Sequence, residues 1–136
     1  MNKGKIINLD NNSAVRKSNP SFEHLNDLII DSIQDIKGKN ILIMDLTSID
    51  DSPTDYFIIC EGDSTTQVKA ISNNIYKRVK DEMNIRSSHI EGIHDSKWVL
   101  LDYFDTVVHI FYPETRTFYD LESLWSDAST KEIVSL

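Results

Sequence analysis

The chain contains, at residues 98–112, the stretch WVLLDYFDTVVHIFY, in which two apolar runs are separated by Phe104 and Asp105. Runs of this length that are rich in β-branched and aromatic residues are typical of β-strands. Because so few residues separate the two runs, the stretch predicts an antiparallel hairpin with strands at 98–103 and 106–112. Such a hairpin needs further elements to cover its apolar side chains.

The two faces of this hairpin differ in polarity. A two-residue turn would pair Trp98 with Phe111, and alternate residues of each strand would then share a face. One face would carry Trp98, Leu100, Asp102, Val107, His109 and Phe111. The other is almost wholly apolar and suits a core beneath helices: Val99, Leu101, Tyr103, Val108, Ile110 and Tyr112. Aromatic anchors beside ionisable groups are typical of protein-binding surfaces, so we interpret the first face as a binding face.

Two alternatives to this interpretation stay open. A helix could cover Trp98 as a core aromatic residue, with Asp102 and His109 paired so that no unpaired carboxylate is buried. A three-residue loop would change which residues share a face. Phe104 leaves that second possibility open, because it is poorly suited to the positive φ of the tightest hairpin turns.

Outside the hairpin, apolar periodicity predicts two long helices and two buried strands. Residues 41–46 and 55–60 are apolar runs of strand length. Apolar residues at spacings of three and four follow Pro20 until Gly38, and they recur between Ser64 and Met83, which predicts amphipathic helices. Ser64 and Gln67 have the spacing of a capping box, in which the hydroxyl and the amide satisfy each other's backbone donors.

The remaining elements are shorter. A strand is expected at 89–91, and a final short helix is marked by Phe118, Leu121, Leu124 and Trp125. The order of elements predicts a single-domain α/β fold, a mixed β-sheet with helices packed on it. We interpret residues 1–19 as a flexible N-terminal tail and 128–136 as a loosely attached C-terminal tail, which leaves 20–127 for the domain.

Composition limits the class of partner. The 136 residues suit one domain, and the net charge is −8. Nucleic-acid binding needs Lys and Arg to neutralise phosphates, so a basic protein is the better electrostatic partner. The single cysteine, Cys60, excludes an internal disulfide, and no apolar stretch approaches the roughly 20 residues that span a bilayer. We therefore expect a cytoplasmic protein with no membrane partner and no sequence-specific nucleic-acid partner.

Candidate catalytic groups are few. Nucleotidyl transfer needs metal-holding carboxylates on neighbouring strands and usually a Gly-Ser turn that cradles phosphate. The candidates are Asp50, Asp51 and Asp55; Gly62-Asp63-Ser64; and His89, Glu91 and His94. The first group falls in an expected loop, the second places a carboxylate where a phosphate would sit, and the third lacks the spacing of zinc proteases. We expect no catalytic residue, metal or cofactor, and keep a magnesium-dependent nucleotidyltransferase-like enzyme as the alternative.

Several dispersed motifs point to a known family. They are DYFIICEG at 55–62, Glu91-Gly92, WVLLDY at 98–103, VVHIF at 107–111, and Arg116 followed by FYDLESLW at 118–125. Their identity and order resemble the ribosomal silencing factor family, also called Iojap-like, from about residue 22 to 127. The family's strand tryptophan, aspartate and histidine fall on Trp98, Asp102 and His109, and its Glu-Gly pair falls on Glu91-Gly92. Combined with the binding face, the resemblance predicts partner contacts by Trp98, Leu100, Asp102, His109, Glu91 and Phe111.

The resemblance implies a nucleotidyltransferase-like α/β fold without the transferase chemistry. It implies a translation repressor that binds the large ribosomal subunit through the large-subunit ribosomal protein numbered fourteen, L-fourteen. That protein lies where the small subunit docks, so occupying it blocks association of the two subunits, notably when nutrients are scarce. An apolar binding face can also pair with itself, which predicts a homodimer of the free protein as a further possibility.

The chain departs from the family at two positions. Phe104 stands in the hairpin turn where the family commonly has Gly, which leaves the turn geometry open. Thr117 stands where the family often has a carboxylate, which alters a contact near the last helix.

Overall fold

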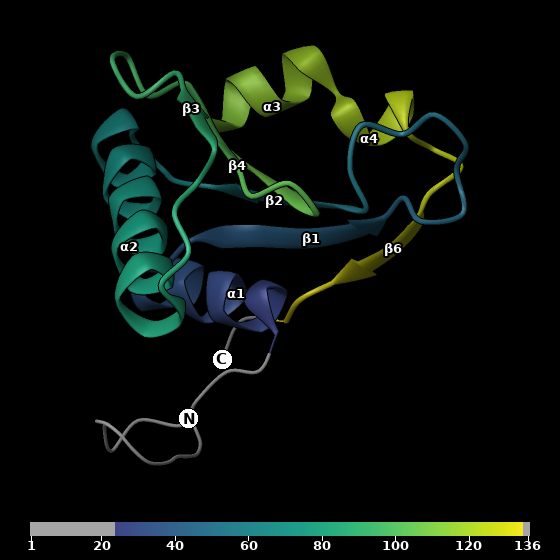
Figure 1. Ribbon diagram of the computed structural model, residues 1–136. Helices are drawn as coiled ribbons and strands as arrows, with labels where there is room; N and C mark the ends of the chain where they lie inside the picture. Colours follow the sequence, from purple (N-terminus) through teal and green to yellow (C-terminus); the bar gives the residue numbers. More distant parts are fainter. Residues whose placement is uncertain (1–23, 135–136) are drawn as a thin grey trace.

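The computed structural model describes residues 24–134 and shows one six-stranded sheet with helices over both faces (Figure 1). The strand order is β3-β4-β5-β2-β1-β6; β2 and β5 are parallel, and the other neighbouring pairs are antiparallel. The elements are α1 (Leu25–Asp35), β1 (Lys39–Asp45), β2 (Tyr56–Glu61), α2 (Thr65–Met83), β3 (His89–Glu91), β4 (Trp98–Asp102), β5 (Thr106–Phe111), α3 (Pro113–Tyr119), α4 (Leu121–Leu124) and β6 (Ser129–Glu132). The predicted mixed α/β fold is confirmed. The tail predicted at 1–19 lies outside the described residues.

The central strands β2 and β5 are buried along nearly their whole length. Strands that are covered on both faces read as continuous apolar runs, which is why the stretch at 55–60 was recognisable as a strand. The strand expected at 41–46 is present as β1, with Leu42 opposite Ile59 and Asp45 opposite Tyr56. Alternate residues of the central strands belong to two separate buried clusters, so the sheet has a hydrophobic core on each of its faces.

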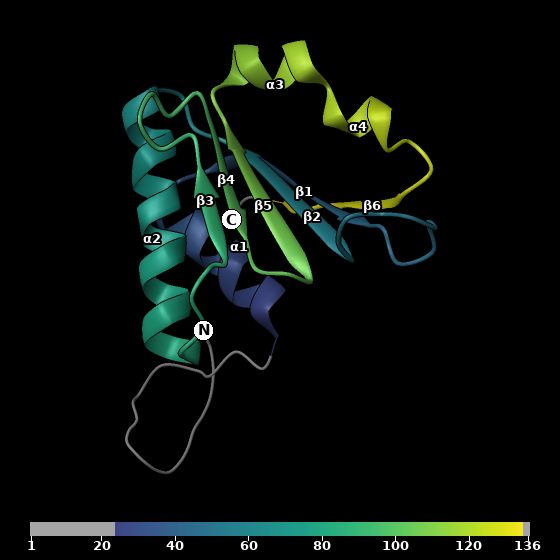
Figure 2. The same ribbon diagram turned by 45° about the horizontal axis from the view of Figure 1, so that its top comes forward.

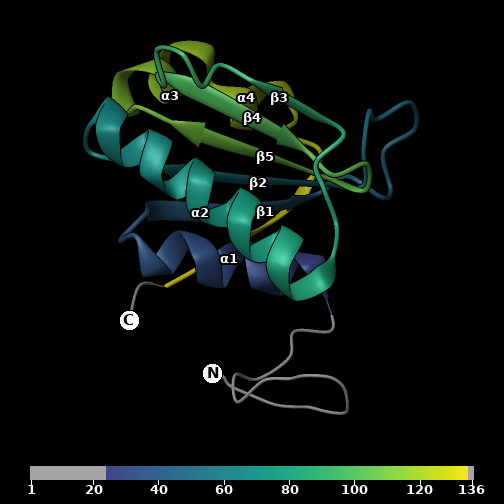
Figure 3. The ribbon, with the colours of Figure 1, turned by 60° about the vertical axis from the view of Figure 1, so that its left-hand side comes forward.

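Helices α1 and α2 pack side by side on one sheet face (Figure 3). The predicted apolar stripe of α2 is fully buried there: Val68, Ile71, Ile75 and Val79. These residues pack with the apolar face of the hairpin, including Val99 and Ile110. This cluster contains more buried residues than the cluster on the other face, and burying each such side chain contributes about 1.5–3 kcal/mol.

The start of α2 differs from the predicted capping box. Ser64 Oγ accepts a hydrogen bond from the Gln67 N–H at 3.1 Å, as expected for an N-cap. The Gln67 side chain does not return to Ser64: its Oε1 accepts the N–H of Asp63 at 2.6 Å, and its Nε2 donates to the carbonyl of Ile36 at 3.0 Å. Because the end of α1 lies within reach, the amide bridges the two helices.

Helix α1 begins at Leu25, later than the start predicted at Pro20, a residue outside the described range. It ends in a Schellman motif, in which the N–H of Gly38 bonds to the carbonyl of Ile33 and that of Lys37 to Gln34. The left-handed residue is Lys37, with φ 63°. Gly38 is still required, because a Cβ there would lie 2.3 Å from a side-chain carbon of Ile33.

The hairpin has the predicted register, with Trp98 opposite Phe111 and Asp102 opposite Val107. Its connection is a tight turn in which the Asp105 N–H donates to the carbonyl of Tyr103 at 2.9 Å. Phe104, at the centre of the turn, takes the positive φ of 71° for which its side chain is poorly suited. The alternative prediction of a three-residue loop in this hairpin is therefore wrong.

The C-terminal part of the fold corrects two expectations. The predicted final helix is two helices, α3 and α4, because Asp120 between them has a left-handed φ of 47°. Within the tail predicted at 128–136, Ser129–Glu132 is not loosely attached, since it forms β6 and pairs with β1. Strand pairing satisfies the backbone donors and acceptors along the edge of β1, and needs no apolar side chains in β6.

Candidate partner-binding surface

Trp98, the predicted anchor, begins β4 and is half-buried on the sheet face opposite α1 and α2. Its indole stacks on Phe111, with the ring centroids 5.0 Å apart, and contacts Tyr119 of α3 at 4.8 Å. Its Nε1–H donates a hydrogen bond to Nδ1 of His109 at 3.0 Å. Trp98 is therefore held in place by its neighbours while part of the ring remains accessible.

His109 and Phe111 lie beneath this surface. Their exposed fractions are 4% and 0%, so the expectation that both contact a partner directly does not hold. The physical reason is the segment that begins with α4, because its Leu121 and Trp125 pack against the buried cluster of this sheet face that contains Phe111. Figure 2 shows α4 over this side of the sheet. The sheet is less covered at β3 and β4 than at the central strands β2 and β5.

Burial also determines the protonation state of His109. It lowers the pKa of the imidazole to about 4, because the charged form would lose its hydration. Nδ1 accepts from Trp98, so the ring proton of the neutral imidazole is on Nε2, which is buried without a hydrogen-bond partner. The alternative in which Asp102 pairs with His109 is therefore wrong.

Glu91, Leu100 and Asp102 lie on the same sheet face as Trp98. The register shows this, because Glu91 of β3 is directly opposite Leu100 of β4. Glu91 is exposed and contacts His89, whereas Leu100 and Asp102 are half-buried. Asp102 has a second role that the sequence did not suggest: its Oδ1 accepts the N–H of Phe104 at 2.8 Å and so holds the hairpin turn.

Two exposed aromatic residues of α3 extend this surface. Phe118 and Tyr119 are 79% and 52% exposed, and their rings contact each other at 5.0 Å. They border a hollow of about 640 Å³ lined by Asp95, Lys97, Trp98, Tyr112, Glu114, Thr115, Phe118 and Tyr119. The apolar spacing predicts that Phe118 belongs to a final helix, but it does not show which helix face is covered, so the exposure of Phe118 and Tyr119 has no signal in the sequence. Leu124 of α4, another residue that marks the predicted helix, is also exposed.

We define the docking surface as the open part of this region together with the α3 aromatics: Glu91, Trp98, Leu100, Asp102, Phe118 and Tyr119. It combines three aromatic rings and one leucine with two carboxylates. Aromatic anchors surrounded by polar groups are the composition of protein-binding sites, and the carboxylates favour a cationic neighbour.

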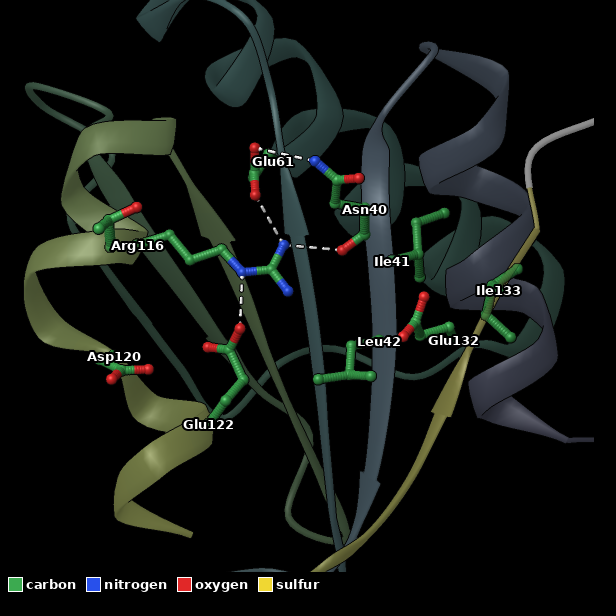
Figure 4. Close-up of a pocket in the computed structure, with 10 residues that line it drawn as sticks. Asn40, Ile41, Leu42, Glu61, Arg116, Asp120, Glu122, Glu132 and Ile133 are labelled. Carbon is green, nitrogen blue, oxygen red and sulfur yellow. Dashed lines mark hydrogen bonds and ion pairs between the residues drawn. The ribbon is translucent and has the colours of Figure 1, made fainter. Parts of the chain in front are cut away.

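Arg116 fixes the position of α3 (Figure 4). Its guanidinium donates to Glu61 of β2 at 2.9 Å, to Glu122 of α4 at 3.1 Å and to the carbonyl of Asn40 at 2.7 Å. The Arg116 side chain is only 11% exposed, so these bonds form in a partly dehydrated setting where they are stronger than on an open surface. Thr117, the departure from the family next to it, is exposed and bonds only locally, to the carbonyl of Pro113.

Two of the side chains considered for catalysis have structural partners. Asp63 pairs with Lys39 at 2.8 Å, and Ser64 caps α2. Burial raises the pKa of the Cys60 thiol well above its usual range, which suits a small packed side chain. Among residues 24–134, no three or more His, Cys, Asp or Glu side chains are grouped so that they could hold a metal ion. In the same part of the chain, no helix is both long and apolar enough to cross a bilayer.

Fold and surface together define a small α/β protein in which two exposed aromatic side chains of α3, Phe118 and Tyr119, lie beside the half-buried Trp98 of β4. The family model for "ribosomal silencing factor during starvation" matches residues 19–136. The chain belongs to the ribosomal silencing factor family.

Individual relatives agree with this assignment. "Ribosomal silencing factor RsfS" of Halalkalibacterium halodurans is 36% identical over 113 residues, which cover 83% of this chain and 95% of the relative. A crystal structure of a Chromobacterium violaceum protein is 36% identical, covers 81% of this chain and 90% of its own, and superposes with a TM-score of 0.71. A mouse protein named "mitochondrial assembly of ribosomal large subunit protein 1" is 38% identical over 76 residues, a third of its length.

Proposed function

We propose that this chain binds the large ribosomal subunit through the docking surface, with ribosomal protein L-fourteen as the direct partner. The bound chain then occupies the place where the small subunit docks, so subunit association is blocked and translation is repressed. The family membership supports a role at the ribosome, and the name of the mouse relative refers to its large subunit.

The observation that carries this proposal is the docking surface. The rings of Trp98, Tyr119 and Phe118 form a chain of contacts in which the last two are more than half exposed. A soluble protein keeps such side chains in water only at a cost, and they are the residue types that supply most binding energy at interfaces. The net charge of −8 favours approach to a basic protein surface over bare RNA.

Co-sedimentation with isolated large subunits tests the proposal. The wild-type chain should sediment with them and should slow their joining to small subunits, as followed by light scattering. Trp98→Ala should weaken binding by about 2 kcal/mol or more, roughly thirtyfold in Kd. Because Trp98 is half-buried, Phe118→Ala is the second variant: its side chain is 79% exposed, so its loss should weaken binding without changing stability.

The matched control is Ile85→Ala. Ile85 is also an exposed apolar residue, but it follows α2, outside the docking surface. It should bind like the wild type. Equal binding by all three variants, or no co-sedimentation of the wild type, would contradict the proposal.

The free protein offers the same surface to a second copy of itself. We propose self-association through Phe118 and Tyr119 in the absence of ribosomes. Light scattering of the wild type and of Phe118→Ala checks this, and identical masses at high concentration would contradict it.

The enzymatic alternative, magnesium-dependent nucleotidyl transfer, predicts nucleotide turnover that disappears on replacing Asp50 or Asp51; none of the geometry described above favours it.

A further inference from the structure

His109 occupies a site where an apolar ring would pack as well. Its imidazole is 4% exposed and lies among the aromatic rings of Phe57, at 4.7 Å, Trp98, at 5.8 Å, and Phe111, at 6.2 Å between centroids. One ring nitrogen, Nε2, is buried without a hydrogen-bond partner, which costs free energy of folding. A phenylalanine has a similar ring and no such cost. The histidine therefore needs a reason other than packing.

The other ring nitrogen supplies that reason. Nδ1 accepts the Nε1–H of Trp98 at 3.0 Å. This hydrogen bond joins neighbouring strands: Trp98 lies on β4 and His109 on β5. The residue of β4 directly opposite His109 is Leu100, two positions after Trp98 on the same sheet face. The hydrogen bond is the polar contact that fixes the rotation of the indole, while Phe111 beneath it and Tyr119 beside it fix the plane. A phenylalanine at position 109 could not accept this hydrogen bond.

We infer that His109 is a positioning residue, which orients the Trp98 indole for partner binding by accepting its N–H. The inference rests on the proposed function, because it assigns His109 a role in that same binding event. The buried imidazole is neutral near pH 7, so Nδ1 is available as an acceptor.

The same bond specifies the chemistry that faces Trp98 in the complex. The only hydrogen-bond donor of the indole is already used inside the protein. The accessible part of Trp98 therefore offers the partner an apolar ring. We expect an apolar group, or the aliphatic stem of a long basic side chain, opposite Trp98, with cationic groups opposite Glu91 and Asp102. An indole that is held in its bound orientation also loses less rotational freedom on binding, which raises affinity.

Two substitutions separate positioning from packing. His109→Phe keeps the ring and removes both the acceptor and the unpaired Nε2, so its unfolding midpoint should equal or exceed that of the wild type. Its affinity for large subunits should fall about tenfold. His109→Asn keeps an oxygen near the place of Nδ1 but leaves a gap, so its midpoint should fall while its affinity stays within about threefold of the wild type. The more stable variant, His109→Phe, should therefore bind more weakly than the less stable variant, His109→Asn.

The indole itself provides a readout in the free protein. With Trp125→Phe as background, Trp98 is the only tryptophan, and its Nε1–H gives the one indole N–H signal in a ¹⁵N-correlated NMR spectrum. That proton should exchange slowly with water in the wild type and in His109→Asn, and fast in His109→Phe. Unchanged exchange in His109→Phe would overturn the inference.

The binding results distinguish a failure of the inference from a failure of the proposed function. If the wild type binds large subunits and His109→Phe binds equally well, the inference is overturned and the proposed function stands. If affinity falls in parallel with stability across the set, His109 serves packing alone and the inference is overturned. If the wild type does not bind, both fail. Should His109→Phe not fold, His109→Asn decides: slow exchange with retained affinity supports the inference, and weak binding despite slow exchange overturns it.

Discussion

Replacing His109 by phenylalanine should remove an acid-dependent loss of stability. Burial lowers the pKa of the folded imidazole to about 4, compared with 6.5 in an unfolded chain. Above pH 6.5 the imidazole is neutral in both states and makes no pH-dependent contribution. As the pH falls from 6.5 to 4, the unfolded chain binds a proton that the folded chain does not, so the free energy of unfolding decreases. Below pH 4 both states are protonated and the loss stops growing.

The size of the effect follows from the gap between the two pKa values, which corresponds to about 3 kcal/mol. Urea unfolding of the wild type and of His109→Phe at several pH values between 7 and 4 measures it. The unfolding free energy of His109→Phe relative to the wild type should rise by about this amount toward pH 4. The lowered carboxyl pKa values of Asp45 and Asp81 act at the acid end of this range and below it, and they cancel in the comparison because both proteins have them. A difference that does not change with pH would refute a buried, neutral His109.

Three further substitutions test the supports of the docking surface. Phe104→Gly should raise the free energy of unfolding by about 1 kcal/mol, because glycine adopts the φ of 71° without strain; a lower thermal midpoint would contradict the assigned turn. Arg116→Met should lower the free energy of unfolding, measured in urea, by about 2–3 kcal/mol, because Glu61 and Glu122 lose their cationic partner in a partly buried place. An unchanged free energy of unfolding would show that Arg116 does not fix the position of α3. Gly92→Ala should cost more than about 2 kcal/mol, because φ is 84° and a Cβ would lie 1.9 Å from the carbonyl oxygen at the start of β4; near-wild-type thermal stability would rule out this backbone approach.

The sequence predicted the hairpin and its faces well, because alternation along a strand depends on nothing else. Given a two-residue turn, the position of Trp98 opposite Phe111 follows at once. The sequence pattern of the hairpin does not show which segment covers each face. His109 and Phe111 are buried by a segment placed through the long-range bonds of Arg116 to β1 and β2, and no local pattern specifies those bonds.

The same limit explains the exposed residues that sequence reasoning missed. Helical spacing from Phe118 to Trp125 predicted one short helix, but the left-handed φ of Asp120 divides it into α3 and α4, and Phe118 is exposed on α3. A positive φ at a residue other than glycine has only a weak sequence signal. The strand β6 was missed for another reason: its residues Ser-Thr-Lys-Glu are all exposed, so its backbone pairing leaves no apolar pattern to detect.

A matched pair of charge reversals tests the central claim most directly. Glu91→Lys lies on the docking surface, and Asp27→Lys lies in the first turn of α1 on the opposite side of the sheet; both residues are exposed, and both changes alter the net charge equally. The affinity of each for isolated large subunits should be measured at fixed salt. If the surface around β3, β4 and α3 meets a basic partner, Glu91→Lys should bind at least tenfold more weakly and Asp27→Lys nearly as well as the wild type. Equal losses in the two variants would show that only the overall charge matters, and unaltered binding by Glu91→Lys would place the partner elsewhere.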